Sequence, residues 1–327
     1  MRPSDLLPLM MDSLLYFAAR SMVVCLQLLP LDCVARLGRV FGSIAYWLDR
    51  RHRRVAQKNL TWCLSDTLSP VEIHACVREH FRRLGENYCS AIKTASMSKE
   101  SLASRVEFVG AEHFVHNKNS VPGGSLVAAI GHFGNFEIYA RIADCFQDYR
   151  GATTYRALRQ PSLTRLVQSL RANSRCLFFE RRKDAGALRK AMSRGGILLG
   201  LLADQHGGDR GLPLPFFGKI CSTNPGPALF ALRYQAPLFV VICYRIGLAR
   251  WRIECSELIA THLDGVPRSA PDIMSEVNRH YEAAIRRDPA NWFWVHNRWK
   301  EGKHRKPTHP VKTSEVFNAT STPELDE

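Results

Sequence analysis

The sequence lacks the patterns that mark metal-binding and disulfide-stabilised proteins. Its ten cysteines include no Cys-x-x-Cys pair, and no group of histidines and cysteines has the spacing of zinc ligands. A chain of 327 residues does not need disulfides to build a core, so we interpret the cysteines as reduced thiols in a protein that faces the cytosol. We therefore expect no metal ion and no cofactor.

Acidic residues are scarce relative to basic ones. The chain has 30 aspartates and glutamates against 45 lysines and arginines, a formal net charge of +15. Such a surface attracts nucleic acids, anionic membranes or acidic proteins, and charge alone does not separate these partners. Because no recognised nucleic-acid-binding motif is present, we expect no nucleic-acid partner.

A clean membrane-spanning run of about 20 apolar residues is also missing. The apolar stretch 14–31 contains Arg20, which costs roughly 3 kcal/mol at the centre of an inserted helix, and Pro30 near its end. No small-residue cleavage site of a signal peptide follows it. We predict that residues 1–34 form a membrane-associating helix, and a helix in the interface fits better than a span.

The next segment has two interpretations. Apolar residues between Leu37 and Leu48 recur at helical spacing and lead into a basic block at residues 49–55. The segment is either a core helix with a solvated charged end or a membrane-surface element. In the second case each arginine would gain about 1 kcal/mol from anionic head groups.

The periodicity predicts an α/β fold. The first hundred residues read as helical, and from about residue 105 strands alternate with helices. Short apolar runs at 125–130, 197–203 and 237–244 predict buried strands. We therefore expect a mostly parallel or mixed central sheet covered by helices. Residues 35–300 form one domain in this interpretation, and the polar segment 301–327 is a disordered tail.

The strongest candidate site lies at the carboxyl end of the first of these strands. His132 and Glu137 straddle a turn that contains Gly131 and Gly134. Residues five apart in one helix point away from each other, whereas a turn can fold the carboxylate back onto the imidazole. This geometry is that of a His–carboxylate base.

The same spacing occurs twice more, at 74–79 inside a predicted helix and at 296–301 beside the tail. We interpret both pairs as structural. Asp204 and Gln205 follow another buried strand, and functional groups gather at the carboxyl ends of such strands.

Residues 131–137, Gly-His-Phe-Gly-Asn-Phe-Glu, resemble the acceptor motif of the lipid A biosynthesis acyltransferases, within the lysophospholipid acyltransferase-like superfamily. Glu137, where related glycerolipid acyltransferases carry Asp, favours the lipid A branch. The resemblance covers about residues 35–300. Other segments that resemble motifs of this family, in order, are 51–60, 155–161, 203–205, 213–218, 223–228 and 291–300. Ala157 and Gln160 depart from the Pro and Asn that are usual in the second of these segments.

The resemblance implies a glycerolipid-acyltransferase-like fold and an O-acyltransferase of lipopolysaccharide biosynthesis. Such an enzyme moves a fatty acyl chain from an acyl-carrier-protein thioester, or acyl-CoA, to a hydroxyl of a lipid A precursor. His132 would be the general base, and Glu137 would hold its tautomer while the substrate hydroxyl attacks directly. Residues implied in substrate binding are Gly131, Asn135, Arg156, Asp204 and Gln205.

Two of these residues have more specific expectations. Arg156, together with backbone N–H groups of the 131–134 turn, would stabilise the developing oxyanion. Asp204 would position the acceptor or orient Arg156, and its alternative role is a helix or turn cap.

Two other functions stay open at this point. One is acylation of another membrane glycolipid or phospholipid on the same fold, and the other is a non-catalytic lipid-binding membrane protein. The expected location is the cytoplasmic face of the bacterial inner membrane, peripheral or single-pass, with inner-membrane lipid as a partner.

Overall fold

The computed structural model of the chain describes residues 3–110, 124–142 and 148–300. The predicted tail, with Glu301, lies outside the described residues. The helices are α1 (Pro3–Leu28), α2 (Leu31–Leu48), α3 (Arg50–Leu64), α4 (Pro70–Thr94), α5 (Lys99–Ala103), α7 (Tyr139–Ile142), α8 (Pro161–Arg171), α9 (Ala185–Arg194), α10 (Gly226–Tyr234) and α11 (Ala270–Arg287), with 3-10 turns η1 (Phe136–Ile138) and η3 (Pro289–Asn291). The strands are β1 (Val106–Val109), β2 (Leu126–Ile130), β3 (Arg150–Tyr155), β4 (Leu177–Glu180), β5 (Ile197–Leu202), β6 (Leu212–Phe216), β7 (Lys219–Thr223), β8 (Leu238–Gly247), β9 (Arg250–Cys255), β10 (His262–Leu263) and β11 (Val266–Pro267).

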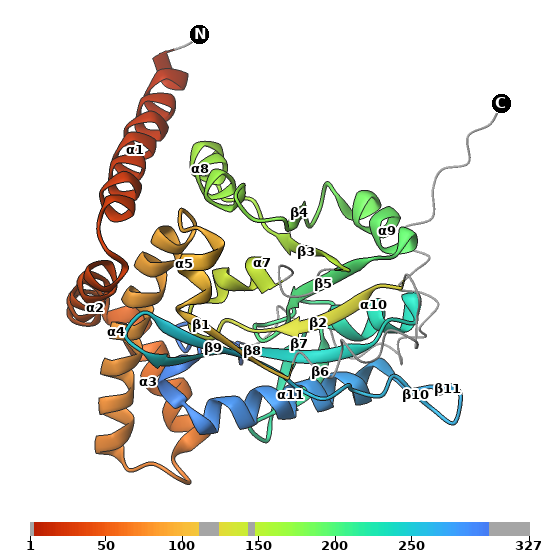
Figure 1. The fold of residues 1–327 in the computed structure, drawn as a ribbon. Coiled ribbons are helices and arrows are strands. Elements are labelled where there is room, and N and C mark those ends of the chain that lie inside the picture. The colour runs from red at the N-terminus through yellow and green to blue at the C-terminus, as the bar shows by residue number, and fades with distance from the viewer. Residues whose placement is uncertain (1–2, 111–123, 143–147, 301–327) are drawn as a thin grey trace, which may run out of the picture.

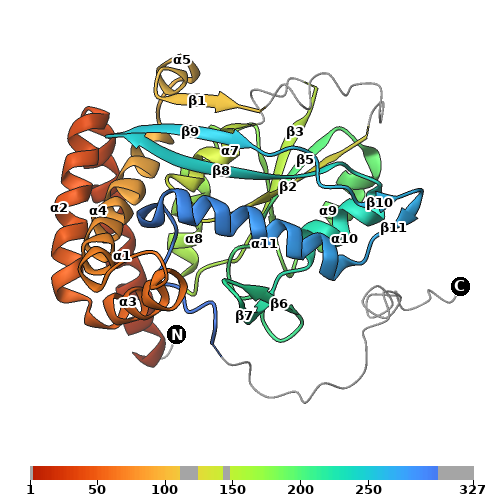
Figure 2. The ribbon, with the colours of Figure 1, turned by 90° about the horizontal axis from the view of Figure 1, so that it is seen from below.

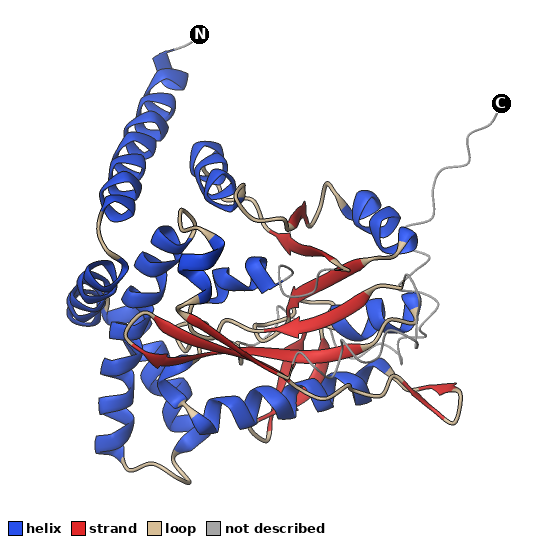
Figure 3. Cartoon of the chain, in the orientation of Figure 1, coloured by secondary structure: helices blue, strands red, loops and turns tan. Residues whose placement is uncertain are grey.

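A seven-stranded sheet organises the molecule, in the order β1-β9-β8-β2-β5-β3-β4. Its pairs are parallel except β8 with β9, which form an antiparallel hairpin. The mixed sheet and its helical covering confirm the predicted fold class, and the helical first hundred residues are confirmed as α1 to α5 (Figures 1 and 3). The short hairpins β6–β7 and β10–β11 were not predicted, because β6 contains two prolines, which are uncommon within strands, and β10 and β11 are only two residues long.

The sheet separates two hydrophobic clusters. In β2 the side chains of Val127 and Ala129 belong to the cluster that includes α9, α10 and α11. The alternate residues Leu126, Ala128 and Ile130 belong to the cluster that includes α7 and β1. This alternation, with every residue of β2 buried, places the strand at the centre of the sheet between two layers of helices (Figure 2).

The helices α2 and α4 pack against each other at unusually short range. A Cβ atom on Gly38 would lie 2.5 Å from the carbonyl oxygen of Gly85, and one on Gly42 would collide with the carbonyl of Phe81. Only glycine permits this approach. One side of α2 is therefore buried against α4.

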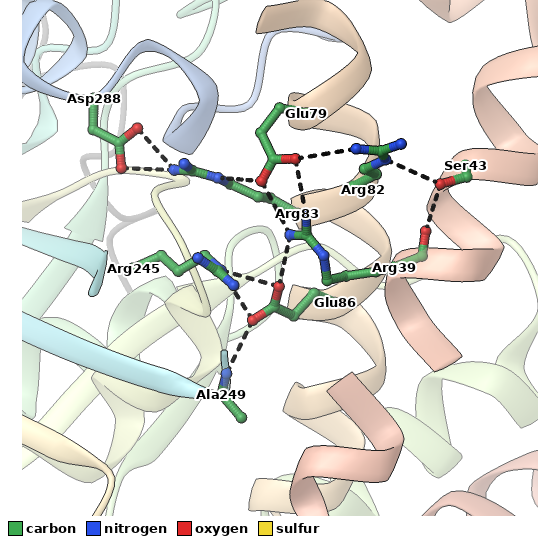
Figure 4. A network of polar contacts seen from close by, with 9 residues as sticks. All are labelled: Arg39, Ser43, Glu79, Arg82, Arg83, Glu86, Arg245, Ala249 and Asp288. Atoms are coloured by element: carbon green, nitrogen blue, oxygen red, sulfur yellow. Dashed lines mark hydrogen bonds and ion pairs between the residues drawn. The ribbon is translucent and has the colours of Figure 1, made fainter. Parts of the chain in front are cut away.

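An ion-pair network joins this helix pair to the sheet (Figure 4). The fully buried Glu86 of α4 accepts hydrogen bonds from Arg39 of α2 and from Arg245 and the Ala249 backbone of the β8–β9 hairpin. Each buried charge thus has an opposite charge and hydrogen-bond partners, as a buried carboxylate requires.

The opposite side of α2 is apolar and exposed. A core helix with a solvated charged end would bury these apolar side chains, so this interpretation does not explain them. Its exposed large residues are Leu37, Val40, Phe41, Ile44, Trp47 and Leu48. Helix α1 is similarly bare, and among the described residues it is the one helix long and apolar enough to cross a membrane, over Met11–Leu28. The two helices lie along one flank of the molecule, opposite the β10–β11 hairpin (Figures 1 and 2). An exposed apolar surface of this extent is typical of a membrane or protein contact.

Candidate active site

The register of two parallel strands brings His132 and Asp204 together. Ile130 at the end of β2 is paired with Leu202 at the end of β5, and the Ala203 N–H donates to the Ile130 carbonyl. His132 and Asp204 each lie two residues beyond these paired positions. Both therefore leave the sheet side by side at its carboxyl edge, where parallel sheets place functional groups.

The Asp204 carboxylate binds His132 through both oxygens. Nδ1 of the imidazole lies 2.8 Å from Oδ1, and the His132 backbone N–H donates to Oδ2 at 2.9 Å. The Trp292 indole N–H also donates to Oδ2, at 2.8 Å. Burial alone would raise the pKa of Asp204, but the His132 charge and these hydrogen bonds outweigh it and lower the pKa to about 2. Asp204 is therefore a permanent anion behind the imidazole.

The imidazole itself is oriented toward a cavity. Phe136 contacts its ring edge to face, and Phe293 lies against it at a ring-centroid distance of 5.7 Å. With Nδ1 directed at Asp204, Nε2 has no hydrogen-bond partner among the described residues. His132 lines this cavity together with residues of α4, η1 and the 290–293 segment. A free imidazole nitrogen on a cavity wall is positioned to accept a proton from a ligand.

The turn after β2 is fixed by its glycines and by the 291–292 segment. Gly134 has φ of +51°, and a Cβ there would lie 2.6 Å from the Cys243 carbonyl oxygen. The Gly134 N–H donates to the Asn291 carbonyl, and Phe133 forms a β-bridge with Trp292. These contacts hold His132 in place from both ends of the turn.

The same contacts bear on the expected oxyanion donors. The backbone N–H groups of His132, Phe133 and Gly134 donate to Asp204, to the Gly131 carbonyl and to the Asn291 carbonyl, respectively. A donor already engaged in this way is not free for a substrate oxygen. The structure therefore argues against these three amides as an oxyanion hole, because the turn uses them to support itself.

Glu137 does not take the position behind the imidazole that the sequence suggested. Its carboxylate forms a bidentate ion pair with Arg171 at the end of α8, with Arg171 Nη2 donating to Oε1 at 2.6 Å and Nε to Oε2 at 3.0 Å. No hydrogen bond to His132 is found for it within the described residues. Glu137 and His132 nevertheless line one cavity, so both reach the same space. The partner of Nδ1 is instead Asp204, because the register of β2 and β5 brings its carboxylate next to the ring.

The other expected site residues are dispersed. Arg156 is exposed on the loop after β3, and Asp204, which faces His132, does not orient it. Asn135 is buried and lines the His132 cavity. Gln205 offers its backbone carbonyl to the buried Arg298. Gly131 lies against the Phe133 ring, where a Cβ would come within 2.7 Å of ring carbon.

Three residues near the site were missed by the sequence interpretation. Arg171 holds Glu137, and Trp292 holds Asp204. Arg298 is fully buried and donates to Gln205, Asn278 and Thr223. Trp292 and Arg298 both lie in the segment 291–300, where a cluster of tryptophans is the signal in the sequence that could have indicated them. Of the two competing His-x4-Glu pairs, the one at 74–79 makes structural contacts, since His74 contacts Tyr46 and Glu79 pairs with Arg39. In the other, His296 accepts a hydrogen bond from the His206 backbone N–H, and Glu301 lies outside the described residues.

Comparison with known proteins gives a consistent assignment. The family model described as bacterial lipid A biosynthesis acyltransferase matches residues 7–301. The chain is 26% identical over 298 residues to the lipid A biosynthesis palmitoleoyltransferase of Escherichia coli (strain K12) and, to the same extent, to the lipid A biosynthesis acyltransferase of Shigella flexneri. Each match covers 88% of this chain and 90% of the relative. The chain therefore belongs to the bacterial lipid A biosynthesis acyltransferases and is an acyltransferase.

Proposed function

We propose that the protein transfers a fatty acyl group from an acyl-carrier-protein thioester to a hydroxyl of a lipid A precursor. The observation that carries the mechanism is the pairing of His132 with a buried, permanently ionised Asp204, which leaves Nε2 at the cavity wall. No Ser or Cys nucleophile is needed, because the acceptor hydroxyl itself attacks the thioester.

In this proposal His132 is the general base. Nε2 takes the proton of the acceptor hydroxyl as its oxygen forms a bond to the thioester carbon. Asp204 fixes the Nδ1–H tautomer and stabilises the imidazolium, as the aspartate does in a Ser-His-Asp triad. When the tetrahedral intermediate collapses, the C–S bond breaks and the imidazolium returns the proton to the leaving thiolate.

In this proposal Glu137 does not fix the tautomer of His132. Its role is to hold Arg171 beside the reacting groups. Glu137 lines the cavity of His132, and Arg171, its ion-pair partner, lines the two neighbouring cavities that share Glu137 with it. Arg171 uses Nε and Nη2 on Glu137, and its remaining N–H groups are donors of the kind that stabilises a developing oxyanion. Arg171 therefore replaces the 132–134 amides as the proposed donor, with the more exposed Arg156 as a contact for the phosphorylated acceptor.

The proposed location is the cytoplasmic face of the inner membrane. The apolar, exposed side of α2 continues directly into the basic start of α3, where Arg50, Arg51 and Arg54 are exposed. Apolar side chains beside arginines suit the boundary between acyl chains and anionic head groups. With α1 as a spanning or interfacial helix, this flank would hold the active site against the membrane that contains the acceptor.

The test is acyl transfer in vitro, read by mass spectrometry. The purified protein is incubated in vesicles with a labelled lipid A precursor or a phospholipid, and with a carrier-protein thioester or acyl-CoA. We expect acylation of the precursor from the carrier thioester, and loss of transfer in H132A and E137A. H74A is the control, because His74 is an exposed histidine whose ring contacts the Tyr46 hydroxyl, a structural contact outside the cavity of His132. Acylation of the phospholipid alone would support the alternative acceptor, and full activity of H132A would contradict the site.

A further inference from the structure

An apolar groove runs between α1, α4 and α8, on the side of η1 and α7. It has a volume of about 430 Å³. Most of the side chains that line it are apolar, and those from α1 and α8 include Met22, Val23, Leu163, Leu166, Val167 and Leu170. Water in such a groove hydrates its apolar walls at a cost in free energy. A hydrocarbon ligand that displaces this water removes the apolar surface of both groove and ligand from water, which favours binding.

The groove is open at its outer side and meets the catalytic cavity at its inner side. Met22 is 52% exposed and Leu158 is 49% exposed, although both line the groove. At the other side, Tyr88, Ala91 and Glu137 line both the groove and the cavity of His132. The groove and the cavity of His132 therefore adjoin along the wall that these three residues form.

The outer opening lies beside the bare apolar surface of α1. Leu14, Phe17 and Val24 of this helix are exposed, and the helix has the length and apolarity of a membrane span. Ser162 of α8 donates to the Asp12 carboxylate of α1, which ties the two walls of the groove together. The groove thus opens toward the surface at which a bilayer would touch the protein, and not toward the sheet.

We propose that this groove binds one hydrocarbon chain of the membrane-resident acceptor lipid, which enters it sideways from the bilayer between α1 and α8. The inference rests on the proposed function and adds the route and the subsite of the acceptor. The donor chain arrives on a water-soluble carrier and has a separate apolar cavity available on the sheet, lined by Ala128, Gly151 and Gly200. Glu137 and Arg171 line both spaces, so both chains would meet beside His132.

Photo-crosslinking tests the subsite independently of turnover. The full-length H132A protein in vesicles is mixed with a lipid A precursor that carries a diazirine on one acyl chain, irradiated, and mapped by mass spectrometry. We expect labelling of α8 and of α1 around Met22 and Val23. Excess unlabelled precursor should compete. V167W, which fills the groove, should reduce labelling by about tenfold, whereas R165W, on the exposed side of the same helix, should leave it unchanged.

Two further probes separate the possible sources of the chain. If a diazirine-bearing acyl thioester of the carrier protein labels these residues and the precursor does not, the groove is the donor site and the proposal is wrong. If a diazirine phospholipid labels them equally and the precursor does not compete, the groove holds bulk lipid and the proposal is again wrong. Failure of wild-type protein to acylate the precursor would instead refute the proposed function, and crosslinking in H132A would still report on the groove.

Discussion

His132 and Asp204 are joined by two hydrogen bonds, one from the imidazole Nδ1 side at 2.8 Å and one from the backbone N–H at 2.9 Å. One carboxylate therefore fixes both the orientation of the ring and the position of the residue that carries it. Because Asp204 is fully buried and also bound by Trp292, the pair has no freedom to rearrange without breaking several contacts. This arrangement makes Asp204 a positioning residue whose charge matters for the reaction.

Replacing the carboxylate by an amide should separate its charge from its shape. We expect D204N to remain folded and to lose activity by about 10²- to 10⁴-fold, since an amide neither fixes the Nδ1–H tautomer nor stabilises an imidazolium. The measurement is kcat with the carrier thioester, alongside a thermal melt. D209N, in the exposed loop that follows, is the control and should keep wild-type kcat. A D204N protein with more than half of the wild-type kcat would contradict the proposed role.

The Glu137–Arg171 pair should behave as one unit. E137Q and R171K each break the bidentate ion pair, because lysine lacks the planar fork of arginine. We expect each to lower kcat by about 10- to 100-fold and the double variant to be little worse than the more damaged single variant. A double-mutant cycle on kcat measures this coupling. Strictly additive losses would show that the two residues act independently.

The sequence was sufficient for the central buried strands and for the edge of the sheet at which the site lies, but not for the two short hairpins or for the pairing of residues within the site. The apolar runs that became β2 and β5 were long enough to identify, and His132 and Asp204 both followed them. The partner of the imidazole depended on β2 lying directly beside β5 in the register Ile130 to Leu202, which no local pattern encodes. Arg171 reaches Glu137 across 34 residues of chain, and such a contact is set by tertiary packing alone.

Histidine burial next to the site should make stability depend on pH. His80 on α4 is 2% exposed, and burial lowers its pKa to about 4 despite a contact to the Ala290 backbone. The unfolded chain, with an ordinary histidine pKa of 6.5, binds the proton more tightly, so stability falls as pH drops from 6.5 toward 4. Between pH 7 and 5 this amounts to about 2 kcal/mol. Urea unfolding should show a smaller loss of unfolding free energy between pH 7 and 5 in H80Q than in the wild type. An equal dependence of the unfolding free energy on pH in the two proteins would refute this.

The buried Glu86 should be the most sensitive member of the network in Figure 4. E86Q leaves Arg245 and Arg39 without its charge in a buried setting, and we expect a loss of roughly 3–5 kcal/mol in the free energy of unfolding. Glu79 pairs with Arg39 and Arg83 but is partly exposed, so E79Q should cost no more than about 1 kcal/mol. Chemical denaturation of both variants gives the comparison. Equal losses would mean that burial does not set the strength of the network.

The exposed apolar side of α2 should insert into anionic membranes. Phe41 and Ile44 are 50% and 48% exposed on this side, and burying a large apolar side chain in lipid is worth about 1.5–3 kcal/mol. We expect F41S/I44S protein to show weaker cosedimentation with anionic phospholipid vesicles at high salt, where the contribution of the arginines is screened. L263S/V266S is the matched control, because these residues are 60% and 65% exposed on the β10–β11 hairpin at the opposite side of the molecule (Figure 1). If both double variants bind vesicles as the wild type does, α2 is not a membrane contact. If F41S/I44S instead changes the oligomeric state in detergent, this side of α2 is a protein interface.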